Sequence, residues 1–183
     1  MAWQIDNSHT SIDFSVRHMM VSRARGRFDD FSGTIDLNVA NPEQTSVFVE
    51  IDAASINTRD AKRDEHLRSA DFLNAEAHPK LVFQSTRVER VGDSAAKLHG
   101  DLTIRDVTKP VVVDVTFLGK SVSPWGATVY GFEGETRISR KQWGLEWNVA
   151  LETGGVLVSD EIAITISLEV VQAAETESAA VAA

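Results

Sequence analysis

The sequence predicts an all-β protein, an eight-stranded antiparallel barrel with one short helical segment around residues 60–73. Three observations predict it: apolar and polar residues alternate over eight segments, turn residues separate many of these segments, and one charged stretch interrupts the alternation. Clean alternation is typical of antiparallel strands with one solvated face, and closure into a barrel removes exposed strand edges. A two-sheet sandwich is the alternative that the same pattern leaves open.

The first strand is predicted over residues 9–18. Ile12, Phe14 and Val16 fall on one face and polar residues such as Asp13 fall on the other, because successive side chains of a strand point to opposite faces. The same period, in segments rich in Val, Ile, Thr and Phe, predicts the other strands. These are residues 33–39, 46–52, 80–88, 97–104, 111–119, 127–139 and 161–170.

Turn-forming pairs separate several of these strands. Asn41-Pro42, Gly92-Asp93 and Ser123-Pro124 each lie between two predicted strands, and Gly154-Gly155 precedes the last one. Residues of these types favour tight changes of chain direction. The predicted strands are therefore joined mostly by short connections, as an antiparallel barrel requires.

Two segments break the alternation. We interpret residues 19–28 as a turn or a short helical link. Residues 60–73 are the helix candidate, in which Asp64 and Arg68 stand four residues apart and can form an ion pair on an exposed helix face. This spacing favours a charged, solvated helix over a set of convergent metal ligands.

The predicted helix is expected to cover one end of the barrel. We expect Leu67 and Phe72 to face the apolar interior and His66 to lie at or near the surface in a structural role. The acidic residues beside His66 then serve the helix itself and not acid–base chemistry.

The composition suits one domain with a tail. The chain has 183 residues, of which 43% are hydrophobic, and this is enough for a core. We assign residues 1–171 to the barrel domain. Residues 172–183 contain no aromatic residue and no strand period, so they are predicted to form a frayed or disordered tail.

The charge and the residue types exclude several classes of partner. A net charge of −9 argues against a nucleic-acid-binding protein, and against docking on anionic lipid through charge alone. The absence of cysteine excludes disulfides and thiolate metal sites. No stretch approaches the roughly 20 apolar residues of a membrane span, so stable membrane insertion is not expected. As written, the chain is expected to be cytoplasmic, and periplasmic or secreted if a leader was removed.

No catalytic or metal-binding motif is evident. The five histidines show no spacing typical of metal ligands, and neither a nucleophile elbow nor a phosphate-binding loop is present. We therefore predict no catalytic residue, no metal and no cofactor. His18 shares its predicted strand face with Phe14 and Val16, and it is either a hydrogen-bonded interior residue or a ligand-contacting one.

Apolar excess on the predicted inner face indicates a binding cavity. An eight-stranded barrel is about the smallest that can hold one small ligand in place of side chains, and a cavity lined by apolar residues would take a hydrophobic molecule. The candidate ligand-binding residues are Phe14, Val16, His18, Met20, Phe28, Phe31, Val49, Leu67, Phe72, Phe83, Phe132, Trp143 and Trp147.

Five segments, taken in order, are typical of one known family. They are WQIDNSHTSIDFSVRHMMVSRARGRF, NTRDAKRDEHLRSADFL, HPKLVFQS, HGDLTIRDVTKPV and RISRKQWGLEWN. Through them the chain resembles the YceI-like family of polyisoprenoid-binding proteins over residues 3–170. One departure is Asp106, where the family more often has glycine, and Asp tolerates a left-handed turn better than most residues.

The resemblance implies a lipocalin-like barrel that holds a long isoprenoid chain, such as a polyprenyl phosphate or a quinone tail. It implies binding, storage or transport without catalysis, and it makes a homodimer plausible. Two other hypotheses remain open at this point. One is an enzyme acting on a small hydrophobic substrate, with His18 as the base. The other is a packed interaction or stress module that binds no ligand.

Overall fold

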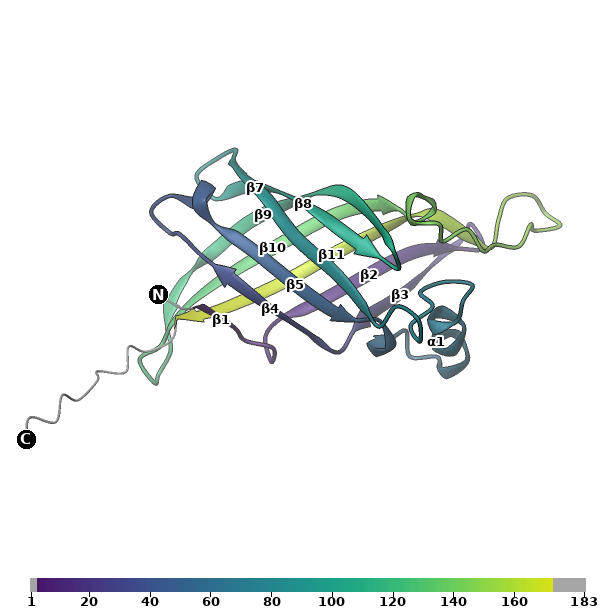
Figure 1. Ribbon diagram of the computed structural model, residues 1–183, viewed down its shortest axis with the longest axis horizontal. Coiled ribbons are helices and arrows are strands. Elements are labelled where there is room, and N and C mark those ends of the chain that lie inside the picture. Colours follow the sequence, from purple (N-terminus) through teal and green to yellow (C-terminus); the bar gives the residue numbers. More distant parts are fainter. Residues whose placement is uncertain (1–2, 173–183) are drawn as a thin grey trace, which may run out of the picture.

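Antiparallel strands close into a barrel with one short helix at one end (Figure 1). The structure is a computed structural model that describes residues 3–172. The strands are β1 Trp3–Ile5, β2 Ser11–His18, β3 Ser22–Phe28, β4 Phe31–Asp36, β5 Ser46–Asp52, β6 Ile56–Asn57, β7 Lys80–Arg90, β8 Ala95–Ile104, β9 Val107–Val122, β10 Thr128–Ser139 and β11 Val158–Gln172. The helices are α1 Ala61–Arg68 and the 3₁₀ turns η1 Pro42–Gln44, η2 Ala53–Ser55 and η3 Arg140–Trp143.

Eight strand positions form the closed ring. Neighbours pair in the order β1-β4-β5-β7-β8-β9-β10-β11, and an additional pairing of β1 with β11 closes it. β2 also pairs with β11, nearer the start of β11, and β3 and β6 continue from β2. β1 and β2 thus act as one interrupted strand along β11. The predicted eight-stranded antiparallel barrel is confirmed.

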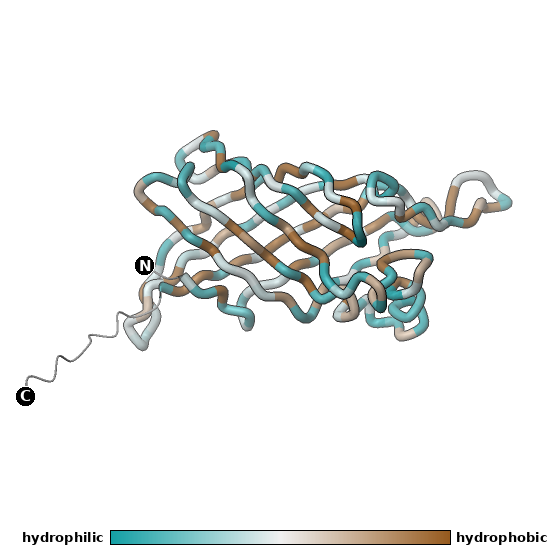
Figure 2. The backbone as a smooth tube through the Cα atoms, in the orientation of Figure 1, coloured by the Kyte–Doolittle hydropathy of each residue, from teal (hydrophilic) through white to brown (hydrophobic). Residues whose placement is uncertain are grey.

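The alternation in the sequence becomes the inside and outside of this barrel. Figure 2 shows hydrophobic and hydrophilic residues alternating along the strands. β11 follows the prediction directly, because Ile162, Ile164, Ile166 and Leu168 all line the interior. The last residue of the strand is Gln172, so the barrel takes in the first residue of the predicted tail. Residues 173–183 lie outside the described part of the chain.

The interpretation of residues 19–28 as a turn or helical link is wrong for most of the segment. Only the first part is a turn, and Ser22–Phe28 is strand β3, paired with β2. The inward positions here include Gly26, which carries no apolar side chain and hides the strand period. A Cβ at Gly26 would lie 2.5 Å from Cζ of Phe14, so the close approach of the ring requires glycine.

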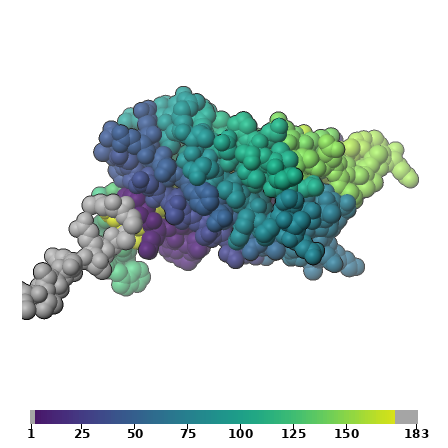
Figure 3. All heavy atoms as spheres, viewed as in Figure 1, coloured from purple at the N-terminus to yellow at the C-terminus, as the bar shows by residue number. Residues whose placement is uncertain are grey.

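The end of the barrel beside α1 is filled by a packed core. Phe31, Ile51, Leu81 and Ile104 are buried there together with Trp143, whose side chain is 1% exposed. The indole Nε1 of Trp143 donates to the carbonyl of Leu102 at 2.9 Å. In Figure 3 the atoms of the α1 region and of the chain that follows η3 lie together at this end. The core therefore closes one end of the barrel.

Arg140, the first residue of η3, fixes the chain that covers this end. It is 2% exposed, and its guanidinium donates to four backbone carbonyls, those of Leu145, Trp147, Val158 and Ser159. Burial lowers the pKa of the Arg140 guanidinium. The side chain replaces the water that these carbonyls would otherwise bind, and so it joins the start of β11 to the covering loop.

Helix α1 is shorter than predicted and its charged residues have other partners. It begins after Asp60, whose carboxylate accepts from the backbone of Lys62 and Arg63, and it ends at Arg68. The predicted ion pair of Asp64 with Arg68 is wrong. Asp64 is 7% exposed, and its Oδ1 accepts from the backbone N and the hydroxyl of Thr58, at 2.9 and 2.5 Å.

Arg68 uses its Nε to donate to the carbonyl of Ala54 at 3.0 Å. Both contacts join α1 to the chain around β6, so the helix is held to the barrel and is not a freely solvated element. None of the helices among residues 3–172 is long and apolar enough to cross a membrane.

We predict that Arg140→Ala lowers the free energy of unfolding by about 3 kcal/mol or more, because a hydrogen bond to a charged group contributes about 1.5–3 kcal/mol and the carbonyls would lose their donor. The matched control is Arg137→Ala, three residues earlier. It removes an exposed ion pair with Glu161 at 2.6 Å and should cost about 1 kcal/mol or less. Urea unfolding of both variants measures the difference, and equal losses would contradict the role given to Arg140.

Candidate functional site

An apolar cavity of about 330 Å³ lies inside the barrel. Its walls are the inner faces of the long strands, so the residues come from every part of the chain. Those that face it with aliphatic or aromatic side chains include Ile5, Ile12, Phe14, Phe28, Phe31, Leu37, Val47, Val49, Phe83, Val88, Leu98, Val111, Val115, Phe132, Ile138, Ile162, Ile164, Ile166 and Leu168. Such a lining suits a hydrophobic molecule and offers few hydrogen-bonding groups.

Small residues on the inner face shape the cavity. A Cβ at Gly100 would collide with the ring of Phe83 on the neighbouring strand, and a Cβ at Gly134 would lie 3.0 Å from Val113. The glycines thus admit large side chains from adjacent strands without distorting the sheet. The shape of the interior is set by these pairs as much as by the apolar residues alone.

The cavity lies between two packed regions. One is the core beside α1, and the other surrounds Ile35, Tyr130 and Val170 near the opposite end. In this second region the rings of Trp3 and Tyr130 pack edge to face, with their centroids 5.0 Å apart. Cavity residues that belong to neither region, such as Ile166, are only partly buried. The cavity therefore borders both packed regions, and core residues such as Phe31, Leu81 and Ile104 form part of its wall.

Six of the candidate ligand-binding residues are brought together around this cavity. They are Phe14, Phe28, Phe31, Val49, Phe83 and Phe132. All six lie on strands and on the face that points inward. The predicted strands contain four of them, but Phe28 and Phe31 lie outside those strands, so the strand period did not identify these two. Their contact with a ligand stays a prediction.

Four of the other candidates lie in the covering structure beyond the cavity wall. Trp143 fills the core, and Leu67 packs against that core from α1. Phe72 and Trp147 contact each other and His66, with ring centroids 4.5 to 5.5 Å apart. Leu67 and Phe72 were expected to face the apolar interior; Leu67 packs on the core, Phe72 packs on His66 and Trp147, and neither lines the cavity.

The remaining candidates lie toward the turn that joins β2 to β3. Val16 and His18 are only partly buried and do not line the cavity, and Met20 is 47% exposed in the turn. The alternation of β2, extended to the end of the strand, predicts that these residues face the interior. In the structure, this part of the chain lies beyond the end of the cavity. The lining residues given by the structure include no histidine, so His18 is not in a position to act as a base there.

Many residues that line the cavity are not among the predicted ligand-binding residues, although the alternation places them on the inner face. Ile12, Leu98, Val111, Val115 and Ile164 are examples. The predicted ligand-binding residues are mostly aromatic, whereas the strand face that a residue occupies, and not the size of its side chain, decides whether it lines the cavity. The alternation of inward and outward residues along each strand is enough to identify these lining residues.

His66 lies near the surface, as expected. Its side chain is 36% exposed, and its Nε2 is 2.8 Å from Oδ2 of Asp71. The ring packs edge-on against Phe72 and Trp147. These contacts hold the segment after α1 against the covering loop, and they give His66 and Asp71 a structural role.

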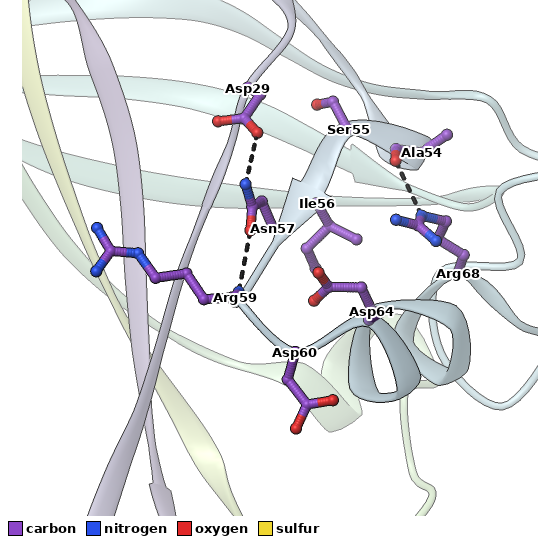
Figure 4. A pocket seen from close by; sticks show the side chains of 10 residues that line it. Asp29, Ala54, Ser55, Ile56, Asn57, Arg59, Asp60, Asp64 and Arg68 are labelled. Carbon is purple, nitrogen blue, oxygen red and sulfur yellow. Dashed lines mark hydrogen bonds between the residues drawn. The ribbon is translucent and has the colours of Figure 1, made fainter.

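A second, polar depression of about 550 Å³ lies between α1 and β6. Figure 4 shows hydrogen bonds between several of its polar groups. Nδ2 of Asn57 donates to Asp29 at 2.8 Å, and the backbone N of Arg59 donates to Oδ1 of Asn57 at 3.0 Å. These bonds join β6 to the end of β3 and to the chain that leads into α1, so these polar groups already have partners and the apolar cavity is the better candidate site.

Among the described residues, one group of ionisable side chains has metal-like spacing. Nδ1 of His9 lies 2.9 Å from Asp6 and 3.6 Å from Glu169. A hydrogen bond from Ser8, then one from His9, lowers the pKa of Asp6 to about 2. The hydrogen bond with Asp6 and the charge of Glu169 raise the pKa of His9. A surface ion-pair cluster explains this geometry.

The comparisons with known proteins agree with the fold. The model of the YceI-like domain matches residues 3–170. The chain belongs to the YceI-like family. It is 40% identical over 155 residues to a UPF0312 protein of Ectopseudomonas mendocina, a match that covers 84% of this chain and 81% of that one.

Solved YceI-like structures share the barrel. The YCEI protein of Campylobacter jejuni is 30% identical, with a TM-score of 0.76 over 86% of this chain and 90% of its own. A polyisoprenoid binding domain from Saccharophagus degradans, implicated in plant cell wall breakdown, is 15% identical. Its TM-score is 0.66 over 93% of this chain and 98% of its own. At that identity the likeness shows the fold alone.

We predict that the ion-pair cluster stabilises this YceI-like protein mainly between pH 3.8 and 6.5, the ordinary pKa values of its Asp and His. Because the pKa of Asp6 is depressed, its contribution is present above pH 3.8 and is lost toward pH 2. Because the pKa of His9 is raised, its contribution is present below pH 6.5 and is lost as the pH rises above that value.

Thermal unfolding of the wild type and of Asp6→Asn across this pH range tests the prediction. The difference in Tm should be largest inside the window and should shrink on both sides. Asp93→Asn removes an exposed carboxylate in the turn between β7 and β8 and controls for net charge. If the difference in Tm between the wild type and Asp6→Asn stays the same at every pH, the predicted link between this ion-pair cluster and stability is contradicted.

Proposed function

We propose that this protein binds one long isoprenoid lipid, of polyprenyl phosphate or quinone type, in the barrel cavity and stores or transports it without chemical change. The observation that carries the proposal is the cavity itself, an interior space walled by aliphatic and aromatic side chains from strands along the whole chain. The Saccharophagus degradans protein that shares this fold is a polyisoprenoid binding domain, which supports the choice of ligand class.

The chemistry of the lining favours a hydrocarbon chain over a polar molecule. Of the described residues, none has a buried side-chain nitrogen or oxygen without a hydrogen-bond partner. A polar ligand inside the barrel would lose its hydrogen bonds to water and find few replacements there. A prenyl tail has no such requirement, so its polar head group would stay at or outside the rim.

Energetics indicate exchange with a membrane. Burying each CH₂ is worth roughly 0.8 kcal/mol against water. For a long prenyl tail the sum would exceed the practical ceiling on affinity of about −18 to −21 kcal/mol. The relevant comparison is therefore the bilayer, where the tail is already out of water. Transfer of the tail between bilayer and cavity is then nearly neutral, as storage or transport requires.

Organic extraction of the purified protein, followed by mass spectrometry, tests the proposal. The extract should contain a prenyl lipid that is absent from an extract of an unrelated protein purified in the same way. After delipidation, the protein should take up an added polyprenyl phosphate or quinone. Failure to find or take up any prenyl lipid would overturn the proposal.

We predict that Ile166→Trp removes most lipid uptake. Ile166 lines the hollow middle of the cavity, so a larger ring occupies space that the ligand needs, at an overpacking cost of about 1–3 kcal/mol. The matched control is Thr165→Trp, whose exposed side chain points outward from the same strand. Lipid retained per folded protein is the measurement. Equal retention by the two variants would contradict binding in this cavity.

A further inference from the structure

The outer face of the β2–β3 hairpin carries four exposed arginines. They are Arg17 on β2 and Arg23, Arg25 and Arg27 on β3. The opposite face of the same two strands lines the cavity with Phe14 and Phe28. The strand period therefore sorts this hairpin into an apolar inner wall and a basic outer wall.

These arginines have few partners. Arg17 and Arg23 lie directly opposite each other in the ladder, and like charges at such positions destabilise a strand pair. Within residues 3–172, only Arg27 of the four forms an ion pair, with Asp29 at 2.7 Å. The chain has 27 acidic residues against 18 lysines and arginines. Arg17, Arg23 and Arg25 therefore form a local patch of positive charge without ion-pair partners among the described residues, a specific feature in so acidic a chain.

The turn of the same hairpin exposes apolar side chains. Met19 and Met20 are each 47% exposed and Val21 is 87% exposed. Both methionines have positive φ, 50° and 65°, where glycine or asparagine is the usual choice in a hairpin turn. The turn thus keeps two long apolar side chains in a conformation that disfavours them.

A neighbouring loop extends this apolar tip. The backbone N of Met19 donates to the carbonyl of Leu157 at 2.8 Å, and Met20 lies against Gly155. Val156, in the same loop, is 38% exposed. The apolar tip is therefore formed by the β2–β3 turn together with the loop before β11.

We propose that the β2–β3 hairpin docks on the surface of an anionic lipid bilayer. The arginines would pair with lipid phosphates, and Met19, Met20 and Val21 would enter the interfacial layer. A polar, basic face beside apolar side chains is the combination that binds such surfaces. Each arginine near an anionic surface adds attraction. This inference rests on the proposed function, since docking would bring one wall of the lipid cavity to the membrane.

Other occupants fit the hairpin less well. Nucleic acid would use the arginines but not the apolar tip. A second copy placed face to face would set one basic patch against another, and like charges there would repel. The net charge of −9 concerns the whole surface, whereas binding to a bilayer depends on the patch that meets it.

Co-sedimentation of the full-length protein with lipid vesicles tests the proposal. Vesicles of phosphatidylcholine alone are compared with an equal mixture of phosphatidylcholine and phosphatidylglycerol, at low and high salt. The wild type should bind the mixed vesicles, and binding should weaken as salt rises. Arg17→Gln/Arg23→Gln/Arg25→Gln should lower the affinity on the order of a hundredfold, because each arginine contributes about fivefold.

Two further variants separate the tip from the charge. Met19→Asn/Met20→Gly suits the turn geometry better, so it should fold at least as well as the wild type and yet bind mixed vesicles more weakly. The charge control is Arg87→Gln/Arg90→Gln/Lys120→Gln, which removes the same number of positive charges from other strands. The control for exposed apolar surface is Trp125→Ser in the β9–β10 turn, where the side chain is 90% exposed. Neither control should change binding.

Several results would overturn the docking proposal. One is failure of the wild type to bind mixed vesicles, and another is a charge control that loses as much vesicle binding as the triple arginine variant. The third such result is weaker vesicle binding by Trp125→Ser with unchanged binding by Met19→Asn/Met20→Gly. Salt-sensitive binding to single-stranded DNA without vesicle binding, or self-association that the triple arginine variant abolishes, would also overturn it. Lipid content by extraction is measured in parallel. Normal prenyl content without vesicle binding refutes docking alone, and absence of prenyl lipid refutes the proposed function.

Discussion

The structure depends on one constraint: the inner face of the barrel is almost wholly apolar, yet it is not filled along its full length. Interior polar groups must be paired, and strands in a closed ring already satisfy their backbone groups. Hydrocarbon is therefore the material best suited to the remaining space. Where side chains supply it, beside α1, the interior is a packed core. Where they do not, a cavity remains.

Closure of the α1 end sets the depth of that cavity. Trp143 fills the core with its indole bonded to Leu102, and Arg140 bonds to the carbonyls of the covering loop and of β11. Buried arginine is costly unless its donors are used, and here its position is fixed by several carbonyls together. The cover is thus an integral part of the fold, and it closes the cavity at this end.

Much of the fold could be predicted because the period of two is a direct consequence of strand geometry. The alternation in β11 identified its inner face residue by residue. The period failed in β3, where Gly26 replaces an apolar side chain because the ring of Phe14 occupies that space. It also misplaced Trp143 and Trp147, since residues outside strands have no face that the period can assign. Asp64 forms a hydrogen bond with Thr58, which lies before the helix. The spacing of residues along a helix cannot predict such a contact.

The most direct test of the central claim is a crystal structure of the protein saturated with a polyprenyl phosphate. Binding in the cavity predicts continuous density for the tail along the inner faces of β8, β9 and β11, in contact with Leu98, Val115 and Ile166, with the head group outside the apolar lining. A tail bound on the outer surface, or an interior closed by side chains with no density inside, would contradict it.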